Sequence, residues 1–291
     1  MNAAVKPPRR NLKENTLKRI LCLSDLHPGS IYGLLPPDFQ SIAGHIVRQN
    51  KGQKYLWDCW NHMISAVTVS PVDAVVIVGD VVEGKQPRSH CAELSLPLVK
   101  DQENAAKTIL HPLVEATKCP LYFVKGTFYH DDEVGRSVDN IAELIGAKEY
   151  EGLGIGIHAK EVLDLDVDGV VIDFSHGISV SGGLYRAVAI DREALWSALS
   201  GKEGKAPKAD VIVRAHAHYF VHVEHPSKHA VILPAWQLQT SYQRKHSRYR
   251  MIPDIGSVIL HVDGEKKKQR QDPCRVEKFL YDLPDLKPTK L

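Results

Sequence analysis

The sequence predicts an α/β domain in which metal-binding side chains gather at one edge of a sheet. Short apolar runs, typical of buried strands, alternate with segments of helical spacing. Carboxylates and imidazoles follow these apolar runs instead of interrupting them. In open α/β architectures, ligands collect at the carboxyl ends of the strands. The order of the polar residues along the chain therefore bears directly on function.

Length and composition are those of an ordinary globular protein. The 291 residues suffice for one large domain or two small ones, and a hydrophobic content of 43% provides for a sizeable core. Because the sequence has no internal repeat and no low-complexity linker, we predict tails over 1–18 and 283–291 around a single domain over 19–282. The net charge of +2 does not by itself indicate nucleic-acid binding.

The cysteines and the N-terminus bear on the cellular compartment. The five cysteines are odd in number and scattered, without a Cys-x-x-Cys pair. This pattern argues against a disulfide framework or a zinc knuckle and favours a reducing compartment. The sequence has neither a run of 18 apolar residues nor a signal-peptide core. We therefore expect a soluble, cytoplasmic protein without a membrane partner, and its oligomeric state stays open.

The first predicted strand covers 20–23 and leads into Asp25 and His27. Residues i and i+2 of an extended segment point to the same side, so this carboxylate and this imidazole can be aimed at one point. Such a pair suits Mn²⁺, Zn²⁺ or Fe²⁺. An isolated Asp-x-His triplet often arises by chance, and the alternative is a loop with a solvated carboxylate.

Four further strand predictions repeat the pattern. The strands over 73–80, 120–126, 155–175 and 210–214 deliver, in this order, Asp80, then Thr127 and His130, then His176, then His216 and His218. A turn would explain the polar residues after any one of these strands. It does not explain why polar residues follow all five strands in order. Two neighbouring divalent metals need a shared carboxylate with mixed nitrogen and oxygen ligands, and this set supplies both.

Segments with helical spacing and hairpin signals fill the rest of the chain. Asp168-Gly169 predicts a hairpin. Pro97 and Pro112 are expected to divide or kink the second helical segment. Helical spacing covers 53–69, 90–118, 136–147 and 188–199, while further strands are expected within 219–263 and over 276–281 and a basic loop over 244–250.

The five ordered motifs, between Ile20 and His218, resemble those of the calcineurin-like metallophosphoesterase superfamily. The resemblance implies a four-layer fold in which two packed β-sheets are flanked by helices, with a dinuclear site at the sheet ends. It implies two divalent ions, with Mn²⁺ preferred and Zn²⁺, Fe²⁺ or Ni²⁺ as alternatives. The implied ligands are Asp25, His27 and His218 for the first metal, Asp80 as the bridge, and His176 and His216 for the second.

The third motif departs from the family pattern Gly-Asn-His-Asp/Glu. Thr127 occupies the position of the metal-binding asparagine, and a hydroxyl is a poorer ligand than an amide oxygen. Two alignments remain open: Thr127 is a weak ligand with His130 reaching back, or the segment is looped out and His130 alone is retained. In the last motif, Ala215 replaces the usual glycine.

The resemblance implies hydrolysis of phosphate esters, with phosphodiesters, including nucleic acids, as the preferred substrates. His130 is the expected catalytic histidine, which stabilises the transition-state oxyanion or protonates the leaving oxygen. Asp131 or Asp132 is expected to orient it, as outer carboxylates do for other histidines. The alternative for these acids is that they begin the following helix.

The basic residues of the sequence include candidates for binding the substrate. Arg186, Arg244 and Arg248 are candidates to hold a phosphate or a nucleic-acid backbone. A basic run is more often a solvated loop, and Trp236 is expected in the core. Two other functions stay open: a phosphomonoesterase acting on a small molecule or a phosphoprotein, and a non-catalytic metal-binding scaffold, which Thr127 favours.

Overall fold

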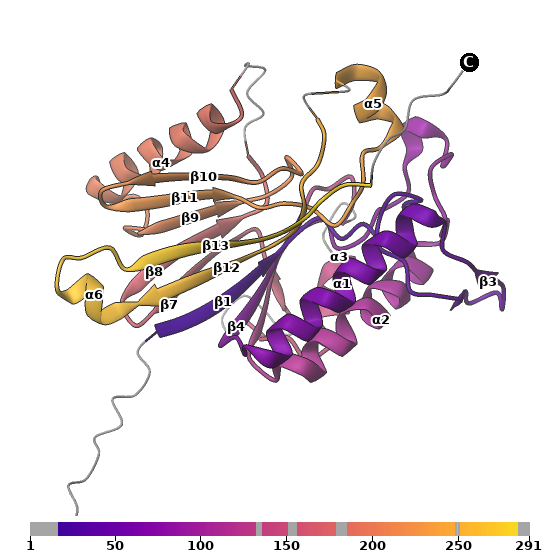
Figure 1. Ribbon diagram of the computed structural model, residues 1–291, viewed down its shortest axis with the longest axis horizontal. Coiled ribbons are helices and arrows are strands. Elements are labelled where there is room, and N and C mark those ends of the chain that lie inside the picture. The colour runs from indigo at the N-terminus through magenta and orange to yellow at the C-terminus, as the bar shows by residue number, and fades with distance from the viewer. Residues whose placement is uncertain are drawn as a thin grey trace, which may run out of the picture.

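Two β-sheets pack face to face, and helices cover both outer faces (Figure 1). The computed structural model describes residues 17–131, 136–150, 156–178, 185–247, 249 and 251–284. This four-layer arrangement confirms the predicted fold class. The domain limits stay a prediction, although the first strand already begins at Leu17.

The first sheet has six strands in the order β13-β12-β1-β4-β5-β6. The four strands from β1 to β6 run parallel, and β12 and β13 are antiparallel additions at one side. Helices α1 (Lys51–Val69), α2 (Val99–Thr117) and α3 (Arg136–Leu144) cover the outer face. The strands are β1 (Leu17–Leu23), β4 (Ala74–Val78), β5 (Leu121–Val124), β6 (Ala159–Lys160), β12 (Ile255–Asp263) and β13 (Cys274–Tyr281).

The second sheet has five strands in the order β10-β11-β9-β8-β7, and α4 (Ala187–Lys202) packs on its outer face. The predicted hairpin is confirmed between β7 and β8, where Asp168 and Gly169 have φ of 53° and 89°, as the tight primed turn requires. The strands are β7 (Val162–Val167), β8 (Val170–Ser175), β9 (Val211–Arg214), β10 (Val221–His225) and β11 (Lys228–Ile232).

The continuous apolar character of β1 follows from burial on both faces. Leu21 and Leu23 pack toward the helices, whereas Ile20 and Cys22 pack between the sheets with Phe174. Alternate residues of one strand thus belong to two different cores. The layers are held together by apolar contact, and the polar residues of the motifs lie where the strands end.

Helix α1 holds the loop that follows His27. Asn50 and Gln53 form a capping box at its start, with reciprocal hydrogen bonds of 2.9 and 3.1 Å. The side-chain amide of Gln53 also donates, through Nε2, to the backbone carbonyl of Ser30 at 3.1 Å. The helix start and the loop that follows His27 are therefore fixed to one another.

Several short elements differ from the expectations. The helical part of 90–118 is one helix that begins at Val99, after Pro97, and contains Pro112, so the chain is not divided there. The basic segment expected as a loop contains α5 (Ser241–Ser247). The remaining elements are β2 (Phe39–Gln40), β3 (Ile46–Val47), the 3₁₀ turn η1 (Pro87–Ser89) and α6 (Gly264–Lys268). Of the helices in the described ranges, none is long and apolar enough to cross a membrane.

Candidate metal centre

The six histidine and aspartate ligands implied by the resemblance meet where strands of both sheets end. They form two groups of three, and within each group one donor atom per residue lies within 4.8 Å of the others. The groups correspond to the expected division between two metals. They are Asp25, His27 and His218, and Asp80, His176 and His216.

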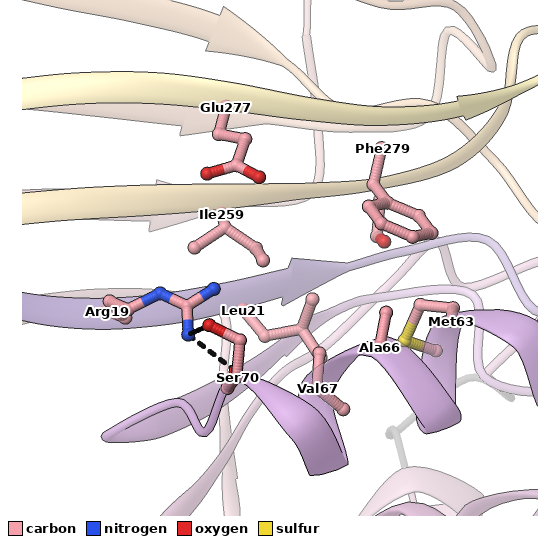
Figure 2. A pocket seen from close by; sticks show the side chains of 10 residues that line it. Arg19, Leu21, Met63, Ala66, Val67, Ser70, Ile259, Glu277 and Phe279 are labelled. Carbon is pink, nitrogen blue, oxygen red and sulfur yellow. Dashed lines mark hydrogen bonds between the residues drawn. The ribbon is translucent and has the colours of Figure 1, made fainter.

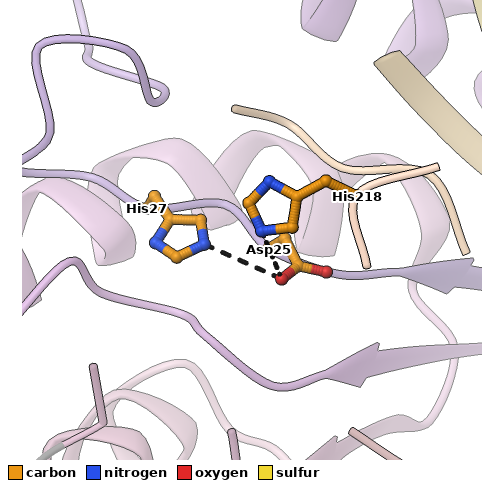
Figure 3. Close-up of side chains that lie close together, drawn as sticks. All are labelled: Asp25, His27 and His218. Carbon is orange, nitrogen blue, oxygen red and sulfur yellow. Dashed lines mark ion pairs between the residues drawn. The ribbon is translucent and has the colours of Figure 1, made fainter. Parts of the chain in front are cut away.

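In the first group, two imidazoles approach one carboxylate oxygen. Figure 3 shows His27 and His218 pointing toward Asp25. The Oδ1 atom of Asp25 lies 3.1 Å from Nε2 of His218 and 3.7 Å from Nε2 of His27. All three residues are buried. The side chains come from the end of β1 and from the segment after β9, so residues far apart in sequence share this point.

In the second group, Asp80 is the central residue. Its Oδ2 atom lies 3.1 Å from Nε2 of His176 and 4.0 Å from Nδ1 of His216. The same oxygen is 3.8 Å from Nε2 of His27, which belongs to the first group. Asp80 therefore stands between the two groups, in the place expected of a bridging carboxylate.

The atoms that face this space form charge contacts with one another but have no hydrogen-bond partner within the protein. Buried polar atoms are normally hydrogen-bonded, so several orphaned atoms at one point need an explanation. Two carboxylate oxygens with imidazole nitrogens form a mixed donor set that suits Mn²⁺, Zn²⁺ or Fe²⁺. The residues present thus fit divalent cations. The atoms are Asp25 Oδ1, His27 Nε2, Asp80 Oδ2, His176 Nε2 and His216 Nδ1.

Charge interactions set the proton affinities of the centre. Burial disfavours the charged forms, but His218 and His176 together keep the pKa of Asp25 well below its usual value. His176 and His130 have the same effect on the pKa of Asp80. Conversely, Asp80 and Asp25 raise the pKa of His176 to about 10 against the effect of burial. Without a cation, protonated imidazoles such as that of His176 balance the charge of the two carboxylates, so a divalent cation would bind by displacing protons from the imidazoles.

Five of the six grouped residues have a left-handed backbone. This region is unfavourable for residues other than glycine, and such conformations concentrate at functional sites. Here they turn the chain sharply as a strand ends and aim the side chain back across the sheet edge. The φ values are 53° for Asp25, 47° for His27, 48° for Asp80, 69° for His216 and 58° for His218.

Two glycines allow the strand ends to approach each other closely. A Cβ atom on Gly79 would lie 2.3 Å from Nδ1 of His176, and Gly79 also has φ of 73°. A Cβ atom on Gly126 would lie 2.2 Å from the backbone nitrogen of Asp80. Both positions therefore require glycine for steric reasons.

Thr127 contacts the carboxylate of Asp80 from the side opposite to Oδ2. Its backbone N–H and its hydroxyl donate to Oδ1 of Asp80, at 2.8 and 3.0 Å. The predicted role of Thr127 as a metal ligand stays a prediction. The structure adds a role that the sequence did not indicate, which is to hold the carboxylate of Asp80 in place.

Asp131 accepts hydrogen bonds from backbone groups. Its oxygens accept from the N–H groups of Val81, at 3.1 Å, of Asp80, at 3.3 Å, and of Gly126. Burial and the nearby charge of Asp80 raise the pKa of Asp131 to about 7. These contacts join the β4 and β5 loops, and they place the carboxylate beside Asp80 and not on His130. Asp132 lies outside the described residues.

His130 lies beside the centre and is oriented by a main-chain carbonyl. Its Nδ1–H donates to the carbonyl oxygen of Glu83, at 2.6 Å. Its Nε2 atom lies 3.9 Å from Oδ2 of Asp80, and its ring packs edge-on against His27. Burial lowers the pKa of His130. In the sequence, His130 lies two residues farther along than the histidine of the family's third motif. Its imidazole nevertheless reaches the two groups around Asp25 and Asp80.

Glu83 is a residue of the centre that the sequence reasoning missed. Its carboxylate lies 2.8 Å from Nδ1 of His27 and is almost fully buried. Gln237 donates to the same carboxylate at 2.9 Å, and Gln86 donates to its other oxygen. A carboxylate in this position fixes the ring of a metal-binding histidine. The available signal was an acidic residue directly after the apolar pair Val81-Val82.

The two described arginines among the candidate substrate contacts engage nearby loops. Arg186 donates to the carbonyl of Ile252 at 3.2 Å and lies over the ring of Tyr219. Arg244 donates twice to the carbonyl of Gln239, at 2.8 and 3.1 Å, and lies over the ring of Tyr32. Neither belongs to the grouped ligands. Arg248 lies outside the described residues.

A small cavity of about 120 Å³ lies elsewhere, between α1 and the outer face of the six-stranded sheet (Figure 2). Its lining is largely apolar, with Arg19 bound to Ser70 at one end. None of the residues in the two groups around Asp25 and Asp80 lines it. The lining residues are Arg19, Leu21, Met63, Ala66, Val67, Ser70, Ser257, Ile259, Glu277 and Phe279.

Comparisons with known proteins find similar structures only. No protein-family profile and no curated protein matches the chain. Vps29 of Entamoeba histolytica complexed with zinc is 14% identical, with 91% of this chain and 99% of that one covered and a TM-score of 0.43. An archaeal phosphodiesterase is 13% identical, with 90% and 99% covered and a TM-score of 0.42. Vps29 of Cryptosporidium parvum is 11% identical, with 92% and 99% covered and a TM-score of 0.43. Likeness at this level says nothing about the activity of this chain.

Proposed function

We propose that this chain, whose motifs resemble those of the calcineurin-like metallophosphoesterases, is a divalent-metal-dependent hydrolase of phosphodiesters. The observation that carries the proposal is that Oδ2 of Asp80 lies between two three-residue groups, 3.8 Å from His27 of the first and 3.1 and 4.0 Å from His176 and His216 of the second. Orphaned buried atoms from both groups face the same space. A binding site for one structural ion would not need this shared carboxylate.

In the proposed enzyme, Asp25, His27 and His218 hold one metal and His176 and His216 the other, with Asp80 between them. Bound divalent cations supply charge neutralisation for the phosphate and a water of lowered pKa. Mn²⁺ is the preferred ion, with Zn²⁺, Fe²⁺ or Ni²⁺ as alternatives. Thr127 holds the bridging carboxylate and, in this proposal, also offers its hydroxyl as a weak ligand.

His130 is the proposed catalytic residue. The carbonyl of Glu83 fixes its Nδ1–H, which leaves Nε2 on the side of the ligand groups. In its protonated form, this nitrogen donates a hydrogen bond to a phosphate oxygen or a proton to the leaving oxygen. Asp131 acts at a distance from His130, by holding the backbone that carries Asp80.

Arg186 and Arg244 are proposed to contact the substrate beyond the scissile phosphate, as is Arg248. Arg186 is linked to the centre through Asp254: the carboxylate of Asp254 lies 3.8 Å from Arg186, and its backbone N–H donates to the carbonyl of His218. Arg244 lies in α5. A guanidinium has five donors, so the two bonds from Arg244 to Gln239 leave donors for a phosphate. A nucleic-acid substrate is the proposal that these positions favour.

The proposal is tested by counting metals and measuring turnover on the same sample. We expect two Mn²⁺ per chain and faster hydrolysis of bis-p-nitrophenyl phosphate than of p-nitrophenyl phosphate. His130→Ala is expected to keep both metals and to lose about 100-fold or more in kcat, because it removes a proton donor and none of the six proposed histidine and aspartate ligands. His45→Ala, which changes an exposed histidine, is the control.

Each other outcome selects a different function. Faster monoester hydrolysis would make the protein a phosphomonoesterase. Two bound metals without turnover on either ester would favour a non-catalytic scaffold. Unchanged diester hydrolysis in His130→Ala would remove this residue from the mechanism and leave the metal centre in place.

A further inference from the structure

A second cluster of metal-binding side chains lies on the five-stranded sheet and shares no residue with the candidate metal centre. It consists of His222 and Glu224 on β10 and His229 on β11, with one donor atom from each within 4.8 Å of the others. We propose that this cluster is a zinc site, independent of the proposed phosphoesterase function.

The register of the two strands brings the three side chains to one face. Val221 and Val223 pack with the cluster of apolar residues beneath α4, so His222 and Glu224 point to the opposite face of β10. Glu224 lies directly across from His229 in the antiparallel ladder. Directly opposed side chains of neighbouring strands are close enough to act on one ligand.

Asp272 fixes the tautomer of His229. Its Oδ1 atom lies 2.8 Å from Nε2 of the buried His229 and also accepts from the N–H of Cys274, at 3.0 Å. Because a carboxylate accepts, Nε2 of His229 carries the proton and Nδ1 keeps its lone pair. A carboxylate behind an imidazole is the arrangement that orients metal-binding histidines.

The lone pair of His229 points at a second imidazole. Nδ1 of His229 lies 2.9 Å from Nε2 of His222, and the two rings are inclined by only 11°. Because Nδ1 of His229 carries no proton, it accepts a hydrogen bond from Nε2–H of His222 when no metal is bound. Zinc would bind the other neutral tautomer of His222, in which the proton lies on Nδ1, so that Nε2 of His222 and Nδ1 of His229 both coordinate the ion.

Two imidazoles and one carboxylate are a donor set that zinc takes with a water as fourth ligand. Glu224 is exposed and supplies the oxygen from the solvent side. Asp272 precedes β13 of the other sheet, so an ion held by β10 and β11 would join the two sheets through the bond between Asp272 and His229. The site would therefore stabilise the edge strand β10.

The test counts zinc in the full-length protein equilibrated with a buffered free Zn²⁺ concentration. His222→Gln and Glu224→Gln are each expected to bind one zinc per chain fewer than the unchanged protein. His225→Gln is the matched control, because this histidine lies on the same strand but pairs with Asp191 at 2.9 Å. The control is expected to keep the full count.

The thermal midpoint gives a second readout. Added Zn²⁺ is expected to raise the midpoint of the unchanged protein more than that of Glu224→Gln, because a ligand that binds only the folded state stabilises it. Glu224 is exposed, so this variant is a test that does not depend on rebuilding a buried position. Circular dichroism of each variant verifies the fold.

Equal zinc counts in the unchanged protein and in both test variants would overturn the proposal. So would a loss of the same size in His225→Gln, which would indicate adventitious binding to surface histidines. A failure of the phosphoesterase proposal is visible separately, as absent ester hydrolysis with the difference in zinc count unchanged.

Discussion

Thr127 donates both its backbone N–H and its hydroxyl to Oδ1 of Asp80, at 2.8 and 3.0 Å. This leaves Oδ2 of Asp80 facing His27, His130, His176 and His216 at distances of 3.1 to 4.0 Å. The residue that stands in place of the expected asparagine is thus built into the centre. It divides the carboxylate of Asp80 between an anchored oxygen and one that is open to a cation.

The hydroxyl of Thr127 is expected to matter for metal binding. Thr127→Val keeps the shape of the side chain and removes one of the two bonds to Asp80, so we expect metal affinity to fall about tenfold. Competition with a chelator measures the change. Thr127→Ser keeps the hydroxyl and is expected to bind metal nearly as tightly as the unchanged protein. Equal affinities of the valine and serine variants would show that the backbone bond alone holds Asp80.

Glu83 is expected to contribute through the ring of His27. Glu83→Gln removes the negative charge that raises the pKa of His27 and orients its ring, so we expect a loss of about 10- to 100-fold in metal affinity. Glu103→Gln is the control, because it also removes a buried carboxylate but one that pairs with Lys100. If both variants lose affinity equally, the effect of Glu83 is not specific to His27.

The sequence predicts the centre where the relevant information is local. Asp25, Asp80 and His176 each end an apolar run, and such runs mark buried strands whose ends gather at one edge. Glu83 and Asp131 behave differently. Their roles depend on which carbonyl, N–H or imidazole from another loop lies beside them, and the spacing of residues along one chain does not specify that.

In the fold, too, the sequence predicts the features that have a local signal and misses those that depend on distant contacts. Continuous apolar runs predict the buried strands, and Asp168-Gly169 predicts its turn, because each signal is local. The helical turn at 241–247 has no such signal, since its Tyr, Arg, Lys and His residues give no apolar periodicity. The order of strands within each sheet also escapes the sequence, because it depends on contacts between segments far apart.

Gly126 is expected to be intolerant of any side chain. Gly126→Ala places a methyl group against the backbone of Asp80, and overpacking of this kind costs about 1–3 kcal/mol in free energy of unfolding. Gly177→Ala is the matched control, because a Cβ atom there has no neighbour within 4 Å and the residue, like Gly126, adjoins a predicted metal ligand. Urea unfolding measures both variants. Equal stabilities would mean that the loops around Gly126 can move apart.

Metal removal is expected to make the stability of the protein fall as the pH rises. In the metal-free protein, Asp80 and Asp25 raise the pKa of His176 to about 10, whereas an unfolded histidine titrates near pH 6.5. The protonated His176 therefore contributes stability that is complete below pH 6.5 and is lost as the pH rises toward 10. Between pH 7 and 9, the free energy of unfolding should fall by about 1 kcal/mol per pH unit.

With metal bound, Nε2 of His176 is expected to hold the cation in place of a proton. The fall in the free energy of unfolding between pH 7 and 9 should then be absent. Urea unfolding at pH 7, 8 and 9, with chelator and with bound metal, compares the two states. His176→Asn without metal is the control, because it removes the titrating group and should flatten the dependence. A metal-free protein whose stability is constant or rises over this range would show that His176 carries no proton between Asp25 and Asp80, and that the two carboxylates are kept apart by other means.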